Sequence, residues 1–409
     1  MRMRRAGLWV LVVIAAWGVS AAVAEDWPQW RGPDRTGISK ETGLLQSWPE
    51  GGPRPRWAVT SLGQGYGSVS VAGGTVYVTG ADGSKAVLYA LGLDGKDKWK
   101  AVFGKLFTKS YAVARCTPTV EGDRVYVYSS GGWAACFEAS GGKKVWDLDT
   151  MRAFDGRNIR WGIAENPLIV GDLFLCQPGG PDAAVVALNK TTGKTVWTSK
   201  GLSERSAYCS PLLVRAGDRQ VVVTQTEEHI VGIDVKTGKV LWKVHQRNRY
   251  AVHPNTPLFF DSMLFVSSGY RHGSQLLRLS ADGSKASQVW TEKKLDCHHE
   301  GVLRIDGYIY GCPSRGRLSC LDPKDGKVLY TVEEVRKASI TYAGGRLYTY
   351  DEKGGNVTLL EVSPKGYKVH GQFAMKAGSG KHWAHPVVAN GTLYIRHGEA
   401  LTAFDIKAN

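Results

Sequence analysis

One short pattern recurs along most of this 409-residue sequence and limits what the chain can fold into. In its clearest copy, residues 187–197 (Ala-Leu-Asn-Lys-Thr-Thr-Gly-Lys-Thr-Val-Trp), a small apolar residue precedes an amide, a glycine turn and a closing tryptophan. The turn glycines recur every 40 to 51 residues, and a period in the forties indicates stacked supersecondary units. These glycines are Gly95, Gly142, Gly193, Gly238, Gly283, Gly326 and Gly366.

Each unit also contains short stretches in which residues of alternating character predict β-strands. In residues 119–128, a Glu-Gly-Asp turn is followed by Arg-Val-Tyr-Val-Tyr, which is typical of a strand entered from a tight turn. We count four such strands per unit. Four strands at this period form one blade of a β-propeller, a fold in which radial repetition leaves only short, protected sheet edges.

The repeated pattern itself has a structural explanation. Asp or Asn side chains accept hydrogen bonds from the backbone of their own turn, and glycine adopts positive φ at low cost, so each copy predicts a hairpin turn. The closing aromatic residue is expected to pack between neighbouring blades. We therefore interpret the pattern as architecture and expect any ligand site to lie elsewhere.

The two ends of the propeller region predict how the ring closes. The last unit stops at Asn409, before any glycine turn or tryptophan, whereas Trp57 is a closing tryptophan with no earlier strands in its own unit. We expect the segment around Trp57 to supply the missing outer strand. The predicted fold is all-β, an eight-bladed propeller of four-stranded antiparallel blades closed by an N-terminal strand. Seven blades is the alternative, because residues 338–372 have lost the glycine and tryptophan pattern.

The segments before the propeller have different compositions. Residues 1–24 combine arginines, an apolar run and a final Ala-Val-Ala, which predicts a secretory signal peptide, with an uncleaved anchor as the alternative. Residues 25–56 are rich in Trp, Pro and Gly and predict an extended arm packed along the propeller. Trp27 and Trp30 could instead stack on a sugar. Residues 57–409 are predicted to form the propeller, and the protein is expected to be exported to the periplasm or beyond.

Charge restricts the class of partner. The formal net charge is +15, and the chain stays basic when the arginines of the predicted signal peptide are removed. Lys and Arg are spread along turns, which indicates a solvated surface or attraction to an anionic envelope polymer. For an exported chain we expect an envelope protein or such a polymer as partner, no nucleic acid, no transmembrane domain after cleavage, and a monomer.

Seven cysteines occupy repeat-equivalent positions for the most part. Equivalent positions in different blades are far apart, so most of these cysteines are expected to be small buried apolar residues. Cys312 and Cys320 share one predicted hairpin, and they are the best candidates for a disulfide.

Chemistry in a propeller is expected near the central channel, which the first strand of each blade lines. Aligning the units places small hydroxyl residues at most inner positions, where they can bond neighbouring backbone. Charged and amide groups there need partners or a ligand; the alternative is a ring of mutual ion pairs that closes the channel. The candidate residues at the axis are Arg115, Asn166, His298, Glu300, Lys337 and His385.

No catalytic or metal centre is predicted from motifs. Adjacent histidines on a strand point to opposite faces, so His298 and His299 are not expected to bind one metal ion. The sequence has no Cys-x-x-Cys-His haem motif and no Gly-x-Ser-x-Gly elbow.

The repeats resemble those of the pyrroloquinoline-quinone (PQQ) propeller superfamily. Residues 234–242 (Asp-Val-Lys-Thr-Gly-Lys-Val-Leu-Trp) are one such tryptophan-docking repeat, and the resemblance runs from about Trp57 to Asp405. The resemblance implies one of two kinds of protein. Quinoprotein dehydrogenases hold PQQ and calcium on the axis, which would place Asn166 and Glu300 near the ion and Arg115 or Lys337 at the quinone carboxylates. BamB-like members bind no cofactor and act as scaffolds.

This sequence departs from both kinds. It has no vicinal cysteine pair and no haem motif, unlike the dehydrogenases, and it has no lipobox cysteine and carries a Trp-rich arm, unlike BamB. Our hypothesis from sequence is an exported, non-catalytic β-propeller that binds or scaffolds envelope components, with no cofactor. The alternative is a PQQ- and calcium-dependent dehydrogenase of an alcohol or sugar.

Overall fold

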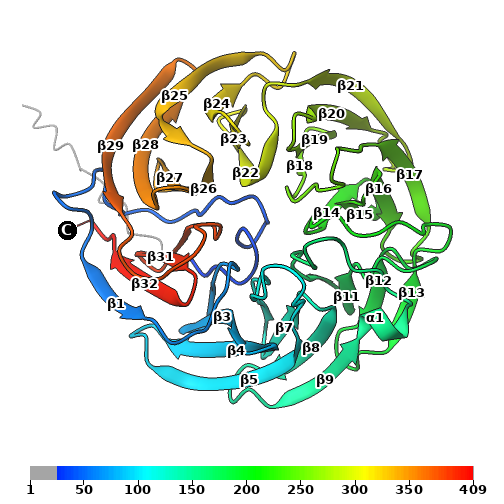
Figure 1. Ribbon diagram of the computed structural model, residues 1–409. Coiled ribbons are helices and arrows are strands. Elements are labelled where there is room, and N and C mark those ends of the chain that lie inside the picture. Colours follow the sequence, from blue (N-terminus) through cyan, green and yellow to red (C-terminus); the bar gives the residue numbers. More distant parts are fainter. Residues whose placement is uncertain (1–24, 409) are drawn as a thin grey trace, which may run out of the picture.

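The repeats fold into eight four-stranded antiparallel sheets arranged as blades around a central axis (Figure 1). The computed structural model describes residues 25–408, so the predicted signal peptide lies outside the described residues. The eight-bladed, all-β prediction is confirmed, and the seven-bladed alternative is wrong because the unit around residues 338–374 keeps all four strands despite its altered turn.

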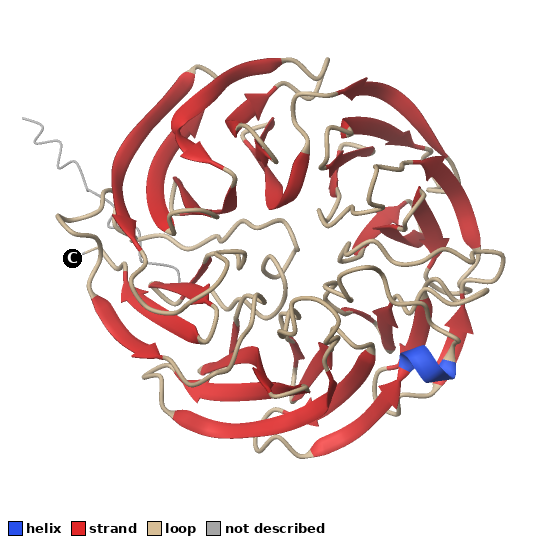
Figure 2. Cartoon of the chain, in the orientation of Figure 1, coloured by secondary structure: helices blue, strands red, loops and turns tan. Residues whose placement is uncertain are grey.

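Within blades 1 to 7 the strands follow chain order from the axis outward, and loops connect the blades (Figure 2). Blades 1 to 4 comprise β2 Ser70–Ala72, β3 Thr75–Asp82, β4 Lys85–Gly92, β5 Asp97–Lys105; β6 Thr119–Glu121, β7 Arg124–Tyr128, β8 Trp133–Glu138, β9 Lys144–Asp149; β10 Leu168–Val170, β11 Leu173–Cys176, β12 Val186–Asn189, β13 Thr195–Thr198; and β14 Leu212–Ala216, β15 Arg219–Gln225, β16 His229–Asp234, β17 Val240–His245.

Blades 5 to 8 comprise β18 Leu258–Phe260, β19 Met263–Ser268, β20 Gly273–Leu279, β21 Ala286–Glu292; β22 Cys297–Ile305, β23 Tyr308–Pro313, β24 Arg317–Leu321, β25 Val328–Arg336; β26 Ala338–Ala343, β27 Arg346–Asp351, β28 Asn356–Ser363, β29 Gly366–Ala374; and β30 Val387–Ala389, β31 Thr392–His397, β32 Ala400–Asp405 with β1 Pro55–Val59. The one helix among the described residues, α1 Thr150–Ala153, is a single turn after β9. No helix in this part of the chain has the length and apolar character needed to cross a membrane.

The ring is closed by pairing the two ends of the propeller region. Strand β1 lies antiparallel to β32, with Trp57 opposite Ala403 and Val59 opposite Leu401. Blade 8 thus takes its outer strand from the N-terminal side of the chain and its three inner strands from the C-terminal side. The predicted closure through Trp57 is confirmed.

The closing tryptophans join each blade to the next. The indole Nε1 of Trp197 donates to the carbonyl of Val235 at 2.8 Å, and its ring lies against Gly238, whose φ of +74° and lack of a side chain allow this approach. A Cβ at Gly238 would lie 2.6 Å from the indole. Corresponding indole bonds run from Trp57 to Leu93, Trp99 to Ala139, Trp146 to Lys190, Trp242 to Gly283 and Trp290 to Pro323.

The arm supplies a tryptophan at the junction of blades 7 and 8, where the repeat has no docking tryptophan of its own. Trp48 is 8% exposed and packs edge-on against Tyr348 and Phe373. It belongs to a core cluster that also holds Leu44 and Phe404, so residues of the arm fill the space between blades 7 and 8. Trp48 and Leu44 of the arm thus pack on the propeller at this junction.

All seven cysteines are buried and free. The predicted disulfide between Cys312 and Cys320 is wrong. Strand pairing sets Cys320 opposite Tyr310 and Gly311 opposite Ser319, so the two cysteines are not cross-strand partners. Each is instead part of the apolar core of blade 6.

Replacing Trp48 tests whether the arm stabilises the ring. Trp48→Ala removes a buried indole, and we expect it to lower the free energy of unfolding by about 3–5 kcal/mol. The Nε1 of Trp48 is buried without a hydrogen-bond partner in the described structure, so Trp48→Phe loses no hydrogen bond and should cost about 1.5 kcal/mol or less. Guanidinium denaturation measures both. Equal, small losses would show that the arm is not part of the folded core.

Candidate functional site

A cavity of about 790 Å³ lies on the propeller axis. The first strands of the blades bring its wall together, as the alignment of repeats predicts for a central channel. Each repeat has one aligned inner position at its first strand, such as Asn166 or His385. In every blade, the residue two positions before it lines the cavity. These eight residues are Tyr66, Arg115, Ala164, Tyr208, Pro254, His298, Lys337 and Trp383.

The arm enters the axis and forms part of this cavity (Figure 1). Trp30 lines it, with the indole Nε1 donating to Thr256 Oγ1 at 3.0 Å and the ring packed edge-on against His385 at 4.7 Å. Trp27, by contrast, is 2% exposed in the core beside blade 1. Of the two tryptophans weighed for sugar stacking, only Trp30 faces the cavity.

Two arginines of the arm fix it in the axis. Arg35 donates to the carbonyls of Pro211 at 2.9 Å and of Pro167, which belong to blades 4 and 3. Arg31 donates to Thr36 at 2.8 Å and to the carbonyl of Val302 in blade 6. Burial lowers the pKa of Arg31 to about 10 and that of Arg35 to about 9. These guanidiniums bind backbone carbonyls instead of carboxylates, so they bring positive charge to the axis.

Most inner positions form a chain of hydrogen bonds between blades. His385 N donates to Ser68 Oγ at 2.9 Å, Ser68 N donates to Thr117 Oγ1 at 3.1 Å, and Thr117 N donates to Asn166 Oδ1. Asn166 in turn donates its N and Nδ2 to Ser210 Oγ at 3.0 and 2.8 Å. Small polar groups here join blades 8 and 1 to 4, and the amide of Asn166 is engaged through both Oδ1 and Nδ2.

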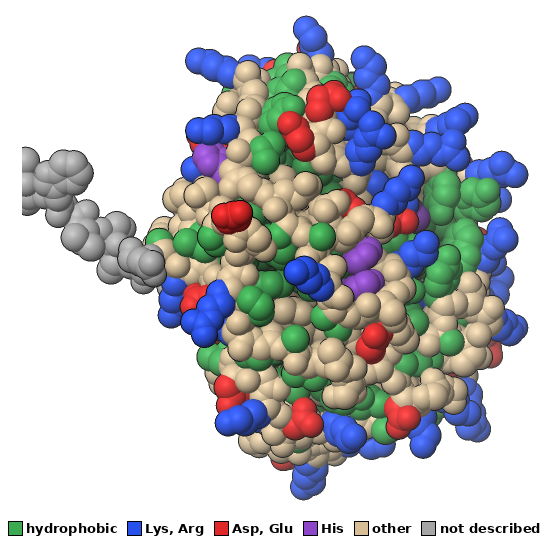
Figure 3. Space-filling model, turned by 60° about the vertical axis from the view of Figure 1, so that its left-hand side comes forward, with side chains coloured by type: hydrophobic (Ala, Val, Ile, Leu, Met, Phe, Trp, Pro, Cys, Tyr) green, Lys and Arg blue, Asp and Glu red, His purple; other side chains and the backbone are tan. Residues whose placement is uncertain are grey.

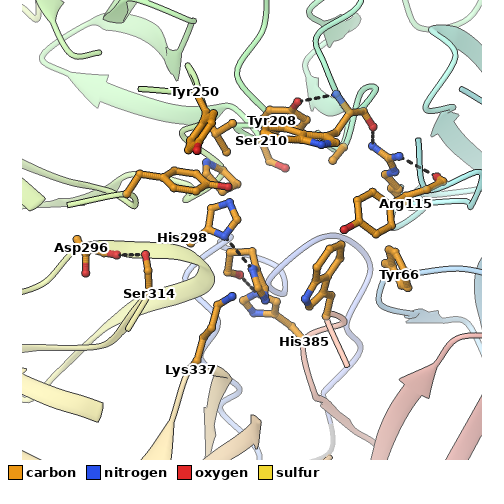
Figure 4. Close-up of a pocket in the computed structure, with 18 of the residues that line it drawn as sticks. Tyr66, Arg115, Tyr208, Ser210, Tyr250, Asp296, His298, Ser314, Lys337 and His385 are labelled. Atoms are coloured by element: carbon orange, nitrogen blue, oxygen red, sulfur yellow. Dashed lines mark hydrogen bonds between the residues drawn. The ribbon is translucent and has the colours of Figure 1, made fainter. Parts of the chain in front are cut away.

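Arg115 and Lys337 both lie on the cavity wall (Figure 4). Arg115 donates to the carbonyls of Ser110, Tyr111, Trp161 and Gly162. Its pKa is lowered to about 10, because burial disfavours the charge. Lys337 forms an ion pair with Glu352.

A cluster of histidines and acids lies beside Lys337. His298 and His299 line the cavity, with their Nδ1 atoms 3.4 Å apart, and Glu300 is fully buried behind them. The expectation that the two rings face opposite ways is wrong. The ladder between β22 and β23 is interrupted between Cys297 and Val302, and a bulge of this kind redirects side chains.

Burial dominates the electrostatics of this cluster. It lowers the pKa of His298 to about 3, with a further contribution from Lys337. It raises the pKa of Glu300 to about 8, although Lys337 opposes the shift. His385 donates its Nε2 to the carbonyl of His299 at 2.8 Å, and burial lowers its pKa to about 3.

Loop residues that the repeat alignment misses supply much of the cavity wall. Several carry an arginine next to an aromatic residue, namely Arg249 with Tyr250 and Tyr270 with Arg271. A third such pair, Arg160 and Trp161, places the guanidinium over the indole at 4.9 Å. Recurrence of an arginine beside an aromatic residue, in loops before first strands or between second and third strands, is the sequence signal that could have located the wall.

A sequence model described as "Outer membrane protein assembly factor BamB" matches residues 94–332, more than half of the chain. The chain belongs to the PQQ-like β-propeller family.

Two curated relatives represent its two kinds of member. A BamB from Kangiella koreensis is 25% identical over 155 residues, 38% of this chain and 35% of BamB. The quinoprotein alcohol dehydrogenase PedH from Pseudomonas putida is 31% identical over 125 residues, 28% of this chain and 20% of PedH. The matched stretches thus span about a third or less of either relative.

Solved structures of both kinds share the fold. BamB from Moraxella catarrhalis superposes with a TM-score of 0.64 at 14% identity, covering 87% of this chain and all of that structure. The quinohemoprotein alcohol dehydrogenase from Comamonas testosteroni gives 0.65 at 12% identity, covering 94% of this chain and 81% of that structure. At such identities the likeness concerns the fold, so the site has to be judged on its own residues.

The axial residues do not fit the calcium and PQQ site that the resemblance implies. Asn166 has its amide engaged between blades 2 and 4, and Glu300 is fully buried and does not line the cavity. Asp296 supplies the one carboxylate of the described cavity wall. A hard cation such as Ca²⁺ takes six to eight oxygen ligands, and these residues do not provide such a set.

Glu165, next to Asn166, is a buried acid that the repeat alignment passed over. It is 1% exposed, and neither carboxyl oxygen has a hydrogen-bond partner in the described structure. Burial raises its pKa well above the usual value. The folded protein therefore holds a proton that the unfolded chain releases above its own pKa of about 4.3.

Glu165→Gln tests this protonation. Because the folded state binds the extra proton, the wild-type free energy of unfolding should fall relative to that of the variant as pH rises above about 4.3, by up to about 1.4 kcal/mol per pH unit until the folded pKa is reached. Below a pH of about 4.3, the difference between the free energies of unfolding of the two proteins should not change with pH. Denaturation curves from pH 3.5 to 8 measure it, and a pH-independent difference would contradict the assignment.

Proposed function

We propose that this protein is an exported, non-catalytic binding protein of the bacterial envelope, and that its axial cavity holds the end of an anionic polymer built from ring-shaped units. The observation that carries the proposal is the composition of the cavity wall, where five Lys or Arg side chains face a single carboxylate, Asp296. Such an excess of one sign in a concave site concentrates ligands of the opposite sign.

The aromatic residues of the wall favour a ligand with flat or ring-shaped faces. Eight Trp or Tyr side chains line the cavity. Tyr250 packs edge-on against Tyr270 at 4.7 Å and against Trp161 at 6.0 Å. Arg249 lies over the ring of Tyr250 at 5.3 Å. Rings alternating with guanidiniums suit sugar units that carry acidic groups, because the faces stack while the arginines pair with the acids.

The arm favours an end of the polymer over its middle. Trp30 and the buried Arg31 and Arg35 occupy the axis, so a chain would enter the cavity and stop there. Arg249, Arg271 and Arg315 are exposed parts of the wall and would meet the following units. On the face shown in Figure 3, Lys and Arg are spread among acidic side chains, which supports a specific role for the cavity.

The cellular setting of the proposal rests on the N-terminal sequence and on relatives. Residues 1–24 have the composition of a signal peptide, and a relative is named as a factor in outer membrane protein assembly. The hydrogen bonds that engage Asn166 and His385 between blades favour binding over chemistry at those positions.

Binding of defined oligomers tests the proposal. Oligogalacturonate, an acidic sugar chain, should bind and should weaken as salt rises, whereas neutral maltooligosaccharide should not. Arg249→Ala should reduce the affinity about tenfold, the loss of one charge-assisted contact. Arg247→Ala is the matched control, because Arg247 is also exposed but is paired with Glu228 outside the cavity. Isothermal titration calorimetry measures the wild type and both variants with each of the two oligomers.

Two results would contradict this proposal. One is equal loss of affinity in the Arg247 and Arg249 variants, which would indicate a diffuse surface effect. The other is tighter binding of polyglutamate than of oligogalacturonate, which would indicate an acidic protein segment as the partner.

Addition of PQQ distinguishes the dehydrogenase alternative. Because the wall does not supply a calcium ligand set, PQQ with Ca²⁺ should raise the melting temperature no more than PQQ without Ca²⁺. A ligand that binds the folded state tightly must raise that temperature by mass action. A calcium-dependent increase, accompanied by a change in the quinone absorbance, would favour the dehydrogenase.

A further inference from the structure

We infer that His298, His299 and Glu300 form a binding site for a divalent transition-metal ion such as Zn²⁺ in the wall of the axial cavity. The Nδ1 atoms of the two histidines lie 3.4 Å apart, and Nδ1 of His299 lies 3.8 Å from Oε1 of Glu300. All three ligand atoms lie within 4.8 Å of one another. Among residues 25–408 this is the one group of three His, Cys, Asp or Glu side chains with such convergence.

The backbone creates this convergence. Between two paired positions, β22 advances from Cys297 to Val302 while β23 moves only from Pro313 to Gly311. The extra residues on β22 bulge out of the ladder, and Gly301 within the bulge has a φ of +80°. Consecutive side chains therefore lose the strict alternation of a strand, and both imidazoles reach the same side.

The spacing suits a tetrahedral ion. Zinc bonds to histidine nitrogen at about 2.0–2.1 Å, and two such bonds at the tetrahedral angle separate the nitrogens by about 3.4 Å. Two imidazoles and one carboxylate are a ligand set that zinc accepts, and it leaves a fourth position open. His298 and His299 line the cavity, so that position would face the cavity.

Surrounding groups support the ligands. Oε2 of Glu300 accepts from the backbone N of His298 at 2.5 Å. Oε1 of Glu300 is buried with no hydrogen-bond partner in the described structure, which is costly unless another group binds it. The opposite nitrogen of His299, Nε2, lies 3.8 Å from Oε2 of Glu352. A carboxylate behind a metal-binding histidine is a recurrent feature of such sites.

The local charges also accommodate an ion. Lys337 acts electrostatically on all three ligands, and it is already paired with Glu352. Arg31 is held by the carbonyl of Val302. The carboxylates of Glu300 and Glu352 together would match the charge of a divalent ion, while Lys337 lowers the affinity. We therefore expect weaker binding than at a site of the same ligands without a neighbouring lysine.

Zinc titration of chelator-treated protein tests the inference, and it needs no polymer or quinone. Calorimetry should show one Zn²⁺ bound per chain. His299→Ala and Glu300→Gln should each weaken binding at least tenfold. His245→Ala is the matched control, because His245 lies at the surface beside His229, with ring centroids 5.7 Å apart, and it should bind zinc as the wild type does. Circular dichroism checks the folding of each variant.

Anomalous diffraction from wild-type crystals soaked in Zn²⁺ provides a test that does not depend on variants. A zinc peak between the three side chains is expected. Absence of zinc binding, unchanged affinity in folded His299→Ala, loss of binding in His245→Ala, or a peak only at other positions would each overturn the inference. If oligogalacturonate binding is measured with a chelator present, failure of either proposal is separately visible.

Discussion

Docking of an indole onto a glycine turn is the interaction on which the rest of this propeller depends. Each contact combines one hydrogen bond from Nε1 with close packing of a ring on a residue that has no side chain, as for Trp197 on Gly238. Repetition of the same contact fixes the angle between neighbouring blades. The number of blades follows from that angle, and so does the position of every inner strand around the axis.

The arm fills two places that the repeats leave empty, the junction between blades 7 and 8 and the central axis. Its C-terminal half places Trp48 at the junction where blade 7 has no docking tryptophan. Its N-terminal half fills the axis, where the carbonyls of Pro167, Pro211 and Val302 accept hydrogen bonds from Arg31 and Arg35. Guanidinium groups suit this task because several donors lie in one plane. Arg31 and Arg35 also leave the axis positively charged. The two residues that hold the arm in the ring therefore also favour an anionic ligand in the cavity.

The sequence predicts those features that repeat. The spacing of the glycines and the unpaired Trp57 lead to eight blades and to the closure between β1 and β32. Alignment of the units also finds Arg115 and Lys337 at the axis, because they occupy the same position in their repeats. Features that occur once were not predictable in this way. The path of the arm through the axis and the bulge that turns His299 toward His298 both depend on tertiary contacts.

The inner positions of the first strands do not form the same hydrogen bonds in all blades. In blades 8 and 1 to 4 its polar groups bond one another, from His385 through Asn166 to Ser210. In blades 6 and 7 the chain is broken: Oε1 of Glu300 and Oγ of Ser339 are buried without hydrogen-bond partners in the described structure. Groups that contradict local rules of folding are expected at functional sites. Because His298 and His299 converge on one side of the axis, the symmetry of the fold is broken at the site proposed for an ion.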